Sequence, residues 1–238
     1  MSDDASLRRA QALEHDNARL RRLLDHQGST AGHRHQMRNT LAMVRDIVRQ
    51  SVDRFAGAED YAAHLESRLD AVFRIQQTIA DRPFDGVDLH TLVMDELVAY
   101  SVNEGEQLSI DGPDIQLLPA AASTLGLALH ELATNAVEFG AVSAPAGRIS
   151  VSWTTSPGED GRDWLTLRWT ETGVEPISPS PHRRGFGTEV IEQALKYQFG
   201  GEGRLEFAPG GLRCTIRLPL SRWLVPPRAI SDSALSDG

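Results

Sequence analysis

The sequence contains one cysteine, Cys214, among 238 residues, so no internal disulfide can form. Clusters of cysteine and histidine with the spacing of metal ligands are also absent, which is typical of a protein from a reducing compartment. Apolar runs are short: none approaches the roughly 20 residues that cross a bilayer, and residues 1–9 lack the apolar stretch of a signal peptide. We therefore expect a cytoplasmic protein without a membrane segment, in which Cys214 is a small core residue.

Aromatic residues make up 6% of the chain, and basic residues are outnumbered, with 24 Lys and Arg against 33 Asp and Glu. The formal net charge of −9 argues against binding to nucleic acid through bulk charge. Residues 1–56 nevertheless carry more arginine than acidic residues, which suits this part to an acidic partner. The content of 40% hydrophobic and 24% charged residues is ordinary for a globular protein of one large domain or two small ones.

The first segment, residues 1–28, is rich in Arg, Leu and Ala. Every third or fourth position forms one seam: Ala10, Leu13, Asn17, Leu20 and Leu24. This spacing predicts a coiled-coil-like helix. Asn17 would occupy an interior position, where a buried amide can fix register, although an exposed residue on a lone surface helix is the alternative.

Residues 29–84 show the pattern of a helical hairpin, after a break that includes Gly28 and Gly32. The apolar face of a first helix, from about 31 to 56, consists of Met37, Leu41, Val44, Val48, Val52 and Phe55. A second helix, ending before Pro83, has Tyr61, Leu65, Leu69, Val72 and Ile79 as its apolar side. Because one hairpin leaves much apolar surface exposed, we expect a four-helix bundle formed by two copies of the chain.

The segment 85–220 mixes helices with strands. We expect helices at 89–101, 120–139 and 187–199, extended pieces near 107–110, 115–118, 148–155 and 163–170, and a hairpin at 203–219. This order predicts an α+β chain, with a helical hairpin followed by a two-layer α/β sandwich. Residues 221–238 are rich in Pro, Ser and Asp and are predicted to be disordered.

Three motifs in the predicted sandwich have residue types suited to chemistry. His130, Glu131 and Asn135 lie within 1.5 turns of one apolar helix, with Glu131 and Asn135 on one face. A carboxamide oxygen suits Mg²⁺, and a neighbouring carboxylate can orient a water or a second group. Polar residues on a helix are, however, most often only its solvated face.

The second and third motifs follow a predicted strand and open a predicted helix. Glu171 stands near a strand end, where a carboxylate can accept a hydrogen bond from an exocyclic amine such as that of adenine. The run from Gly185 to Thr188 combines glycines with a helix start, whose free N–H groups and dipole can hold phosphate. A simple glycine turn is the alternative for this run.

In this order the three motifs resemble the N, G1 and G2 boxes of the ATP-binding domain of histidine kinases, gyrase-type ATPases, Hsp90 and MutL. Three features resemble the HWE family of bacterial sensor histidine kinases: His130 in the N box, Trp169 and Glu171 in G1, and a helix that contains the run His35-Gln-Met-Arg38-Asn39. The resemblance spans about residues 30–220.

The resemblance implies a role for each matching residue. Asn135 would hold Mg²⁺ at the ATP phosphates, Glu131 would assist catalysis, and His35 would accept the phosphoryl group. The nucleotide would be bound by the remaining motif residues: His130, Trp169, Glu171, Gly173, Gly185, Phe186, Gly187 and Thr188. The implied partners are the receiver domain of a response regulator, a second copy of the chain and an upstream sensor protein.

The predicted geometry of the first hairpin helix independently supports His35 as the phosphoacceptor. At roughly 100° per residue, His35 lies opposite the apolar face of that helix and points to solvent. A neutral imidazole has a pKa near 6.5 and offers a nitrogen lone pair at neutral pH. His33 precedes Arg34 and is a rival acceptor.

The sequence departs from the family pattern at Gln36, which is neither the acid nor the arginine usual after the phosphoacceptor, and at Gly32 and Val174. Gln36 and Val174 favour an alternative, a phosphotransfer or adaptor protein with a degenerate ATP-binding domain. The intact Asn135, Gly185 and Gly187 argue against it. An ATPase or a serine kinase of the anti-sigma type on the same fold is a further alternative, which would not need His35.

Overall fold

The computed structural model describes residues 37–38, 40–49, 58–81, 86–100, 107–158, 161–174, 186–208 and 210–220. The chain divides into two compact units, Met1–Arg45 and Asp46–Gly238. In the first unit, the described residues 37–38 and 40–45 are helical, as predicted, and Met37 and Leu41 are exposed. The predictions for Asn17, His35, Gly185 and residues 221–238 lie outside the described residues.

The second hairpin helix is α2, Ala58–Asp81, which confirms the predicted helix. Its buried face differs in part from the predicted one and consists of Arg68, Ala71, Val72, Ile75 and Ile79. Tyr61, Leu65 and Leu69 are only half-buried. The reason is that α2 packs against α4 of the α/β sandwich, and this contact turns Arg68 inward.

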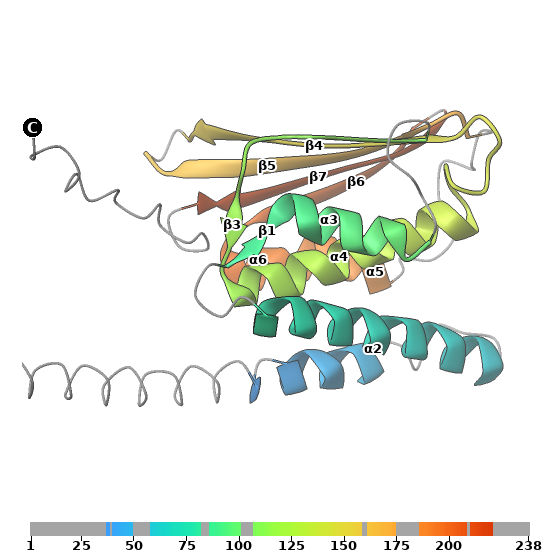
Figure 1. Cartoon of the computed structure of the whole chain (residues 1–238), viewed down its shortest axis with the longest axis horizontal. Coiled ribbons are helices and arrows are strands. Elements are labelled where there is room, and N and C mark those ends of the chain that lie inside the picture. The colour runs from blue at the N-terminus through green and yellow to red at the C-terminus, as the bar shows by residue number, and fades with distance from the viewer. Residues whose placement is uncertain are drawn as a thin grey trace, which may run out of the picture. The chain divides into compact units, whose positions relative to one another are not determined.

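The sandwich has one layer of helices against one five-stranded sheet, in the order β2-β4-β5-β7-β6 (Figure 1). The strands are β2 (Leu108–Asp111), β4 (Arg148–Pro157), β5 (Asp163–Thr172), β6 (Glu202–Ala208) and β7 (Gly211–Pro219). The helices are α3 (Leu89–Val98), α4 (Pro119–Glu138) and a run of α5 (Phe186–Glu189), η1 (Val190–Ala194) and α6 (Leu195–Phe199). Two short strands, β1 (Val87–Asp88) and β3 (Gln116–Leu117), pair with each other. The predicted α+β fold is confirmed.

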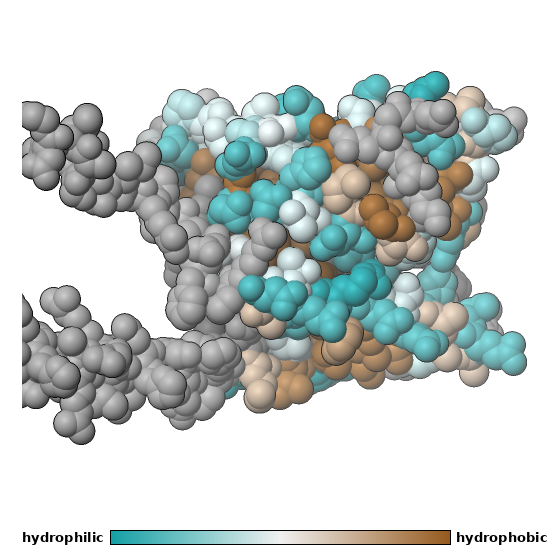
Figure 2. Space-filling model, in the orientation of Figure 1, coloured by the Kyte–Doolittle hydropathy of each residue, from teal (hydrophilic) through white to brown (hydrophobic). Residues whose placement is uncertain are grey.

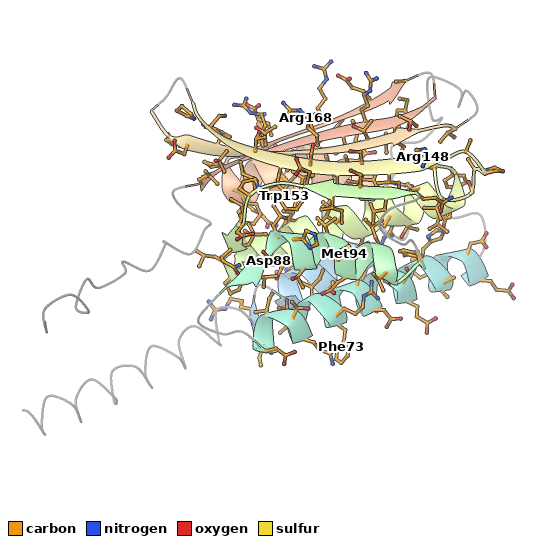
Figure 3. The ribbon with its side chains drawn as sticks, turned by 45° about the horizontal axis from the view of Figure 1, so that its top comes forward. Phe73, Asp88, Met94, Arg148, Trp153 and Arg168 are labelled. Atoms are coloured by element: carbon orange, nitrogen blue, oxygen red, sulfur yellow. The ribbon has the colours of Figure 1, made fainter. Side chains whose placement is uncertain are left out.

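Alternating side chains divide the sheet into a core face and an open face. Trp153 and Trp169 are 2% and 1% exposed and lie on the core face. Arg148 and Arg168 project from the other face, away from the helices (Figure 3). This period of two is what a half-buried strand requires.

Two helices of the sandwich also differ from the sequence prediction. The helix predicted at 187–199 contains a π-helical segment, Val190–Ala194, between its α-helical ends. The helix predicted at 89–101 ends at Val98. The spacing of hydrophobic residues cannot distinguish a π-helical turn from an α-helical turn in a segment of only five residues. One turn is too short for the two periods to place different residues on the buried face.

None of the described helices is both long and apolar enough to span a membrane.

Candidate functional site

Helix α4 carries the first motif. Pro119 stands in its first turn, where the missing N–H does no harm, and the helix is rich in Ala and Leu. His130 and Glu131 are 2% and 7% exposed, so they are not a solvated face. Asn135, one turn beyond Glu131, is exposed. The helix therefore buries two polar side chains and presents the third, an amide, to solvent.

Glu131 is held by a residue of the hairpin. Arg68 of α2 donates from Nε to Oε1 at 2.7 Å and from Nη2 to Oε2 at 3.2 Å. The two side chains are 8% and 9% exposed. A paired guanidinium and carboxylate in this side-on geometry satisfy each other where water cannot. Glu131 is thus a buried carboxylate with a fixed orientation.

His130 is held from both ring nitrogens. Its Nδ1 lies 3.1 Å from Oε2 of Glu96 on α3, and its Nε2 lies 3.2 Å from the hydroxyl of Ser67 on α2. With the proton on Nδ1, the ring donates to Glu96 and accepts from Ser67. Glu96 also accepts from Nη2 of Arg74 at 2.9 Å. His130 therefore links the hairpin helix to the helical layer of the sandwich.

Glu171 has both carboxylate oxygens occupied within the protein. Oε2 accepts from the backbone N–H of Ala141 at 2.9 Å, and Oε1 accepts from Nε1 of Trp169 at 3.0 Å. Burial raises the pKa of Glu171 above its ordinary value, while the two hydrogen bonds act in the opposite direction. The pattern Trp-x-Glu thus has a local reason: on one strand face, residues two apart are neighbours, and the indole orients the carboxylate.

Glycine is required for different reasons in the second and third motifs: backbone conformation at Gly173 and close packing at Gly187. Gly173 has a φ of 75°, which favours glycine, and a Cβ there would collide with the carbonyl oxygen of Ala146. Gly187 has an ordinary backbone, but a Cβ there would lie 2.8 Å from Cβ of Glu131. Val174 donates its N–H to the carbonyl oxygen of Gly210 at 3.1 Å. Thr188 is half-buried, and Phe186 begins α5.

The structure brings the three motifs together on one helix. Gly187 of the third motif lies against Glu131, and Glu171 of the second motif binds Ala141, three residues beyond the end of α4. These segments are far apart in the sequence. Within the described ranges, no group of three or more His, Cys, Asp or Glu could hold a metal ion by itself.

Sequence reasoning missed the polar residues that connect α2 to the sandwich: Ser67, Arg68, Arg74 and Glu96. A signal was present for Arg68, which continues the spacing of the apolar residues Val72, Ile75 and Ile79 toward the start of the helix. An arginine in an apolar stripe needs a buried partner. No comparable signal marks Ser67, because a serine is ordinary on any helix face.

Comparison with known proteins gives consistent results. The family model described as HWE histidine kinase matches residues 33–114. The blue-light-activated histidine kinase of Rhizobium johnstonii is 31% identical over 220 residues, which are 91% of this chain and 58% of that protein. Blue-light-activated histidine kinase 1 of Erythrobacter litoralis is 34% identical over 191 residues, 79% of this chain and 51% of that protein. The chain therefore spans little more than half the length of these relatives.

A solved structure shows the same fold. The blue-light-activated histidine kinase EL346 of Erythrobacter litoralis superposes with a TM-score of 0.55 and 16% identity, covering 79% of this chain and 59% of that one. The likeness in fold agrees with the likeness in sequence. Residues 33–114 thus match the HWE histidine kinase family, and most of the chain is similar to blue-light-activated histidine kinases.

Proposed function

We propose that this chain is the catalytic core of a protein-histidine kinase in two-component signalling. It would transfer the γ-phosphoryl group of ATP to His35 and then to an aspartate of a response-regulator receiver domain. The observation that carries the proposal is the convergence of the three motifs at α4, through the contacts of Glu131 with Gly187 and of Glu171 with Ala141. The family match over residues 33–114 and the similarity to named histidine kinases support the same reaction.

The residues near α4 fit a magnesium nucleotide. Asn135 offers an exposed amide oxygen, a hard ligand, and Mg²⁺ usually takes its remaining ligands from phosphate oxygens and water. The missing cluster of acidic ligands among the described residues is compatible with this arrangement. When bound, Mg²⁺ would neutralise charge on the phosphates. Glu131, one turn away and fixed by Arg68, would orient the groups around Asn135.

The other motif residues would bind the rest of ATP. Gly185, Phe186, Gly187 and Thr188 would surround the phosphates at the start of the helical run. Glu171 would accept a hydrogen bond from the adenine amine, using a lone pair that neither Trp169 nor Ala141 occupies, since each carboxylate oxygen has two. His35 would attack the γ-phosphorus, so that the new N–P bond forms as the bond to ADP breaks.

Labelling the full chain with γ-phosphate-labelled ATP tests this proposal. We expect a label that is stable to base and labile to acid, absent from His35→Ala and from Asn135→Ala, and retained by His33→Ala. Loss of label in His33→Ala with retention in His35→Ala would show that His33 is the acceptor. An unchanged magnesium-dependent affinity of Asn135→Ala for ATP would exclude Asn135 as a ligand.

A second candidate function, a phosphotransfer or adaptor protein, is favoured by one observation. Val174 stands where the family has a glycine, and its N–H donates to the carbonyl oxygen of Gly210, which restrains the backbone directly after Gly173. An adaptor would bind a receiver domain without labelling itself from ATP. The same labelling experiment, followed by addition of a receiver domain that is already phosphorylated, separates the two functions.

A further inference from the structure

Glu131 is the point at which the hairpin helix, the N-box helix and the G2 box meet. From one side, Arg68 of α2 donates to both of its oxygens, at 2.7 and 3.2 Å. From another side, Gly187 of α5 approaches so closely that a Cβ on it would lie 3.3 Å from Oε2 of Glu131. A carboxylate oxygen therefore lies directly behind the backbone of the segment that would bind the ATP phosphates.

The charge of Glu131 bears on phosphate binding because it is shielded from water. Its side chain is 9% exposed, and charges in such surroundings interact more strongly than charges in solvent. Without a partner, a carboxylate behind Gly187 would repel an incoming polyphosphate. Arg68 supplies the opposite charge, and it comes from the hairpin rather than from the sandwich itself.

The geometry of the pair also fixes the place of the carboxylate. A guanidinium that binds side-on holds both oxygens at once, which a lysine ammonium cannot do. Neither side chain can leave without stranding a buried charge. The position of Glu131 therefore depends on whether α2 lies against α4.

We propose that Arg68 is a positioning residue of the nucleotide site, which holds and neutralises Glu131 behind the phosphate-binding segment, so that docking of the hairpin and binding of the ATP phosphates favour each other. The inference rests on the proposed function, because it needs the phosphates to bind at Gly187. It adds a residue outside the ATP-binding domain to the determinants of nucleotide affinity.

The test is the affinity of the full chain for ATP, ADP and adenosine, measured by calorimetry at low salt. In Arg68→Ala we expect the affinity for ATP to fall by about tenfold, the affinity for ADP to fall less, and that for adenosine to stay unchanged. Glu131→Gln introduced into Arg68→Ala should restore ATP affinity, since it removes the unpaired charge. Arg68→Lys, which keeps the charge but not the fork, should lie between Arg68→Ala and the wild type.

Arg74→Ala is the matched control, because it breaks another arginine–glutamate pair of α2, with Glu96, without touching Glu131. We expect it to bind all three ligands as the wild type does. If circular dichroism shows that Arg68→Ala is unfolded, Arg68→Gln replaces it, since its amide can still bond to Glu131.

The outcomes separate the two proposals. If the wild type binds no ATP, the proposed function fails and this inference fails with it. If the wild type binds ATP and Arg68→Ala binds it equally well, only the inference is overturned. An equal loss of affinity for ATP and adenosine, or no recovery in the double variant, would also overturn it, because either result means that Arg68 supports the fold alone.

Discussion

At the scale of single residues, the buried carboxylate of Glu171 accepts hydrogen bonds from two N–H groups. Its Oε1 and Oε2 serve Trp169 and Ala141 separately. In Glu171→Gln, an amide NH2 group replaces one of these oxygens and lies against the N–H of Trp169 or Ala141. Because both groups are donors, that hydrogen bond is lost. We expect this variant to lose about 1–3 kcal/mol of unfolding free energy, measured by urea denaturation.

Glu66→Gln is the control for that measurement, because Glu66 is exposed on α2 and loses the same charge. It should unfold within about 0.5 kcal/mol of the wild type. Equal unfolding midpoints for Glu171→Gln and Glu66→Gln would show that the two hydrogen bonds of Glu171 do not stabilise the fold.

The raised pKa of Glu171 predicts a pH dependence with a definite sign. Burial lifts the pKa of the folded state above the ordinary value of 4.5, so the folded chain holds this proton more tightly than the unfolded chain. The contribution of Glu171 to stability is then fully present below pH 4.5 and is lost as the pH rises through the folded pKa. The difference in unfolding free energy between the wild type and Glu171→Gln should fall over this window. A difference that rises with pH would mean that the hydrogen bonds outweigh burial.

The burial of Cys214 could be predicted from its residue type, whereas the buried ion pair of Arg68 could not. The thiol is buried and its pKa is raised to about 12, which fits the core residue expected from the sequence. The motif residues on α4 were also identifiable, since Glu131 and Asn135 are close along one helix. The pairing of Arg68 with Glu131 was not, because the two lie 63 residues apart and only the packing of α2 on α4 brings them together.

At the scale of secondary structure, helix α3 has an N-cap residue, Asp88, of a type that favours this position. Asp88 precedes the helix and accepts from the backbone N–H of Thr91 at 2.8 Å and from its hydroxyl at 2.9 Å (Figure 3). Asp88→Ala leaves an N–H of the first turn unsatisfied, and we expect a loss of about 1 kcal/mol in unfolding free energy.

Asp88→Asn retains an oxygen acceptor and should lose much less than Asp88→Ala, because asparagine is an equally good N-cap. Chemical denaturation of the two variants beside the wild type provides the comparison. Equal losses in both variants would assign the effect to the charge of Asp88, not to the cap.

Most elements could be predicted because their signals are local. The alternation in β4 and β5 and the long apolar run of α4 predicted the ends of these segments to within two residues. The parallel pairing of β2 with β4 could not be predicted, because strand neighbours are chosen by packing across the chain. The π-helical turn in η1 likewise has no signal in hydrophobic spacing.

At the scale of the whole molecule, α2 has an apolar residue on the side that faces away from the sandwich. Phe73 is 62% exposed (Figure 3), and Figure 2 shows hydrophobic surface along the lower edge of this view. Single exposed apolar residues are common. The prediction of a four-helix bundle gives Phe73 a specific partner, the hairpin of a second copy.

Substitution of Phe73 therefore tests the predicted homodimer. Phe73→Asp places a charge in the expected contact between the hairpins, and burial of an unpaired charge is unfavourable, so we expect the dimer to dissociate. The fold itself should tolerate the change because the side chain is exposed in the single chain. Tyr197→Asp is the control, since Tyr197 is 83% exposed on α6 and lies outside the hairpin. Light scattering over a concentration series should give a dimeric mass for the wild type and Tyr197→Asp and a monomeric mass for Phe73→Asp. A monomeric wild type at every concentration would refute the homodimer, and a dimeric Phe73→Asp would place the contact on another face.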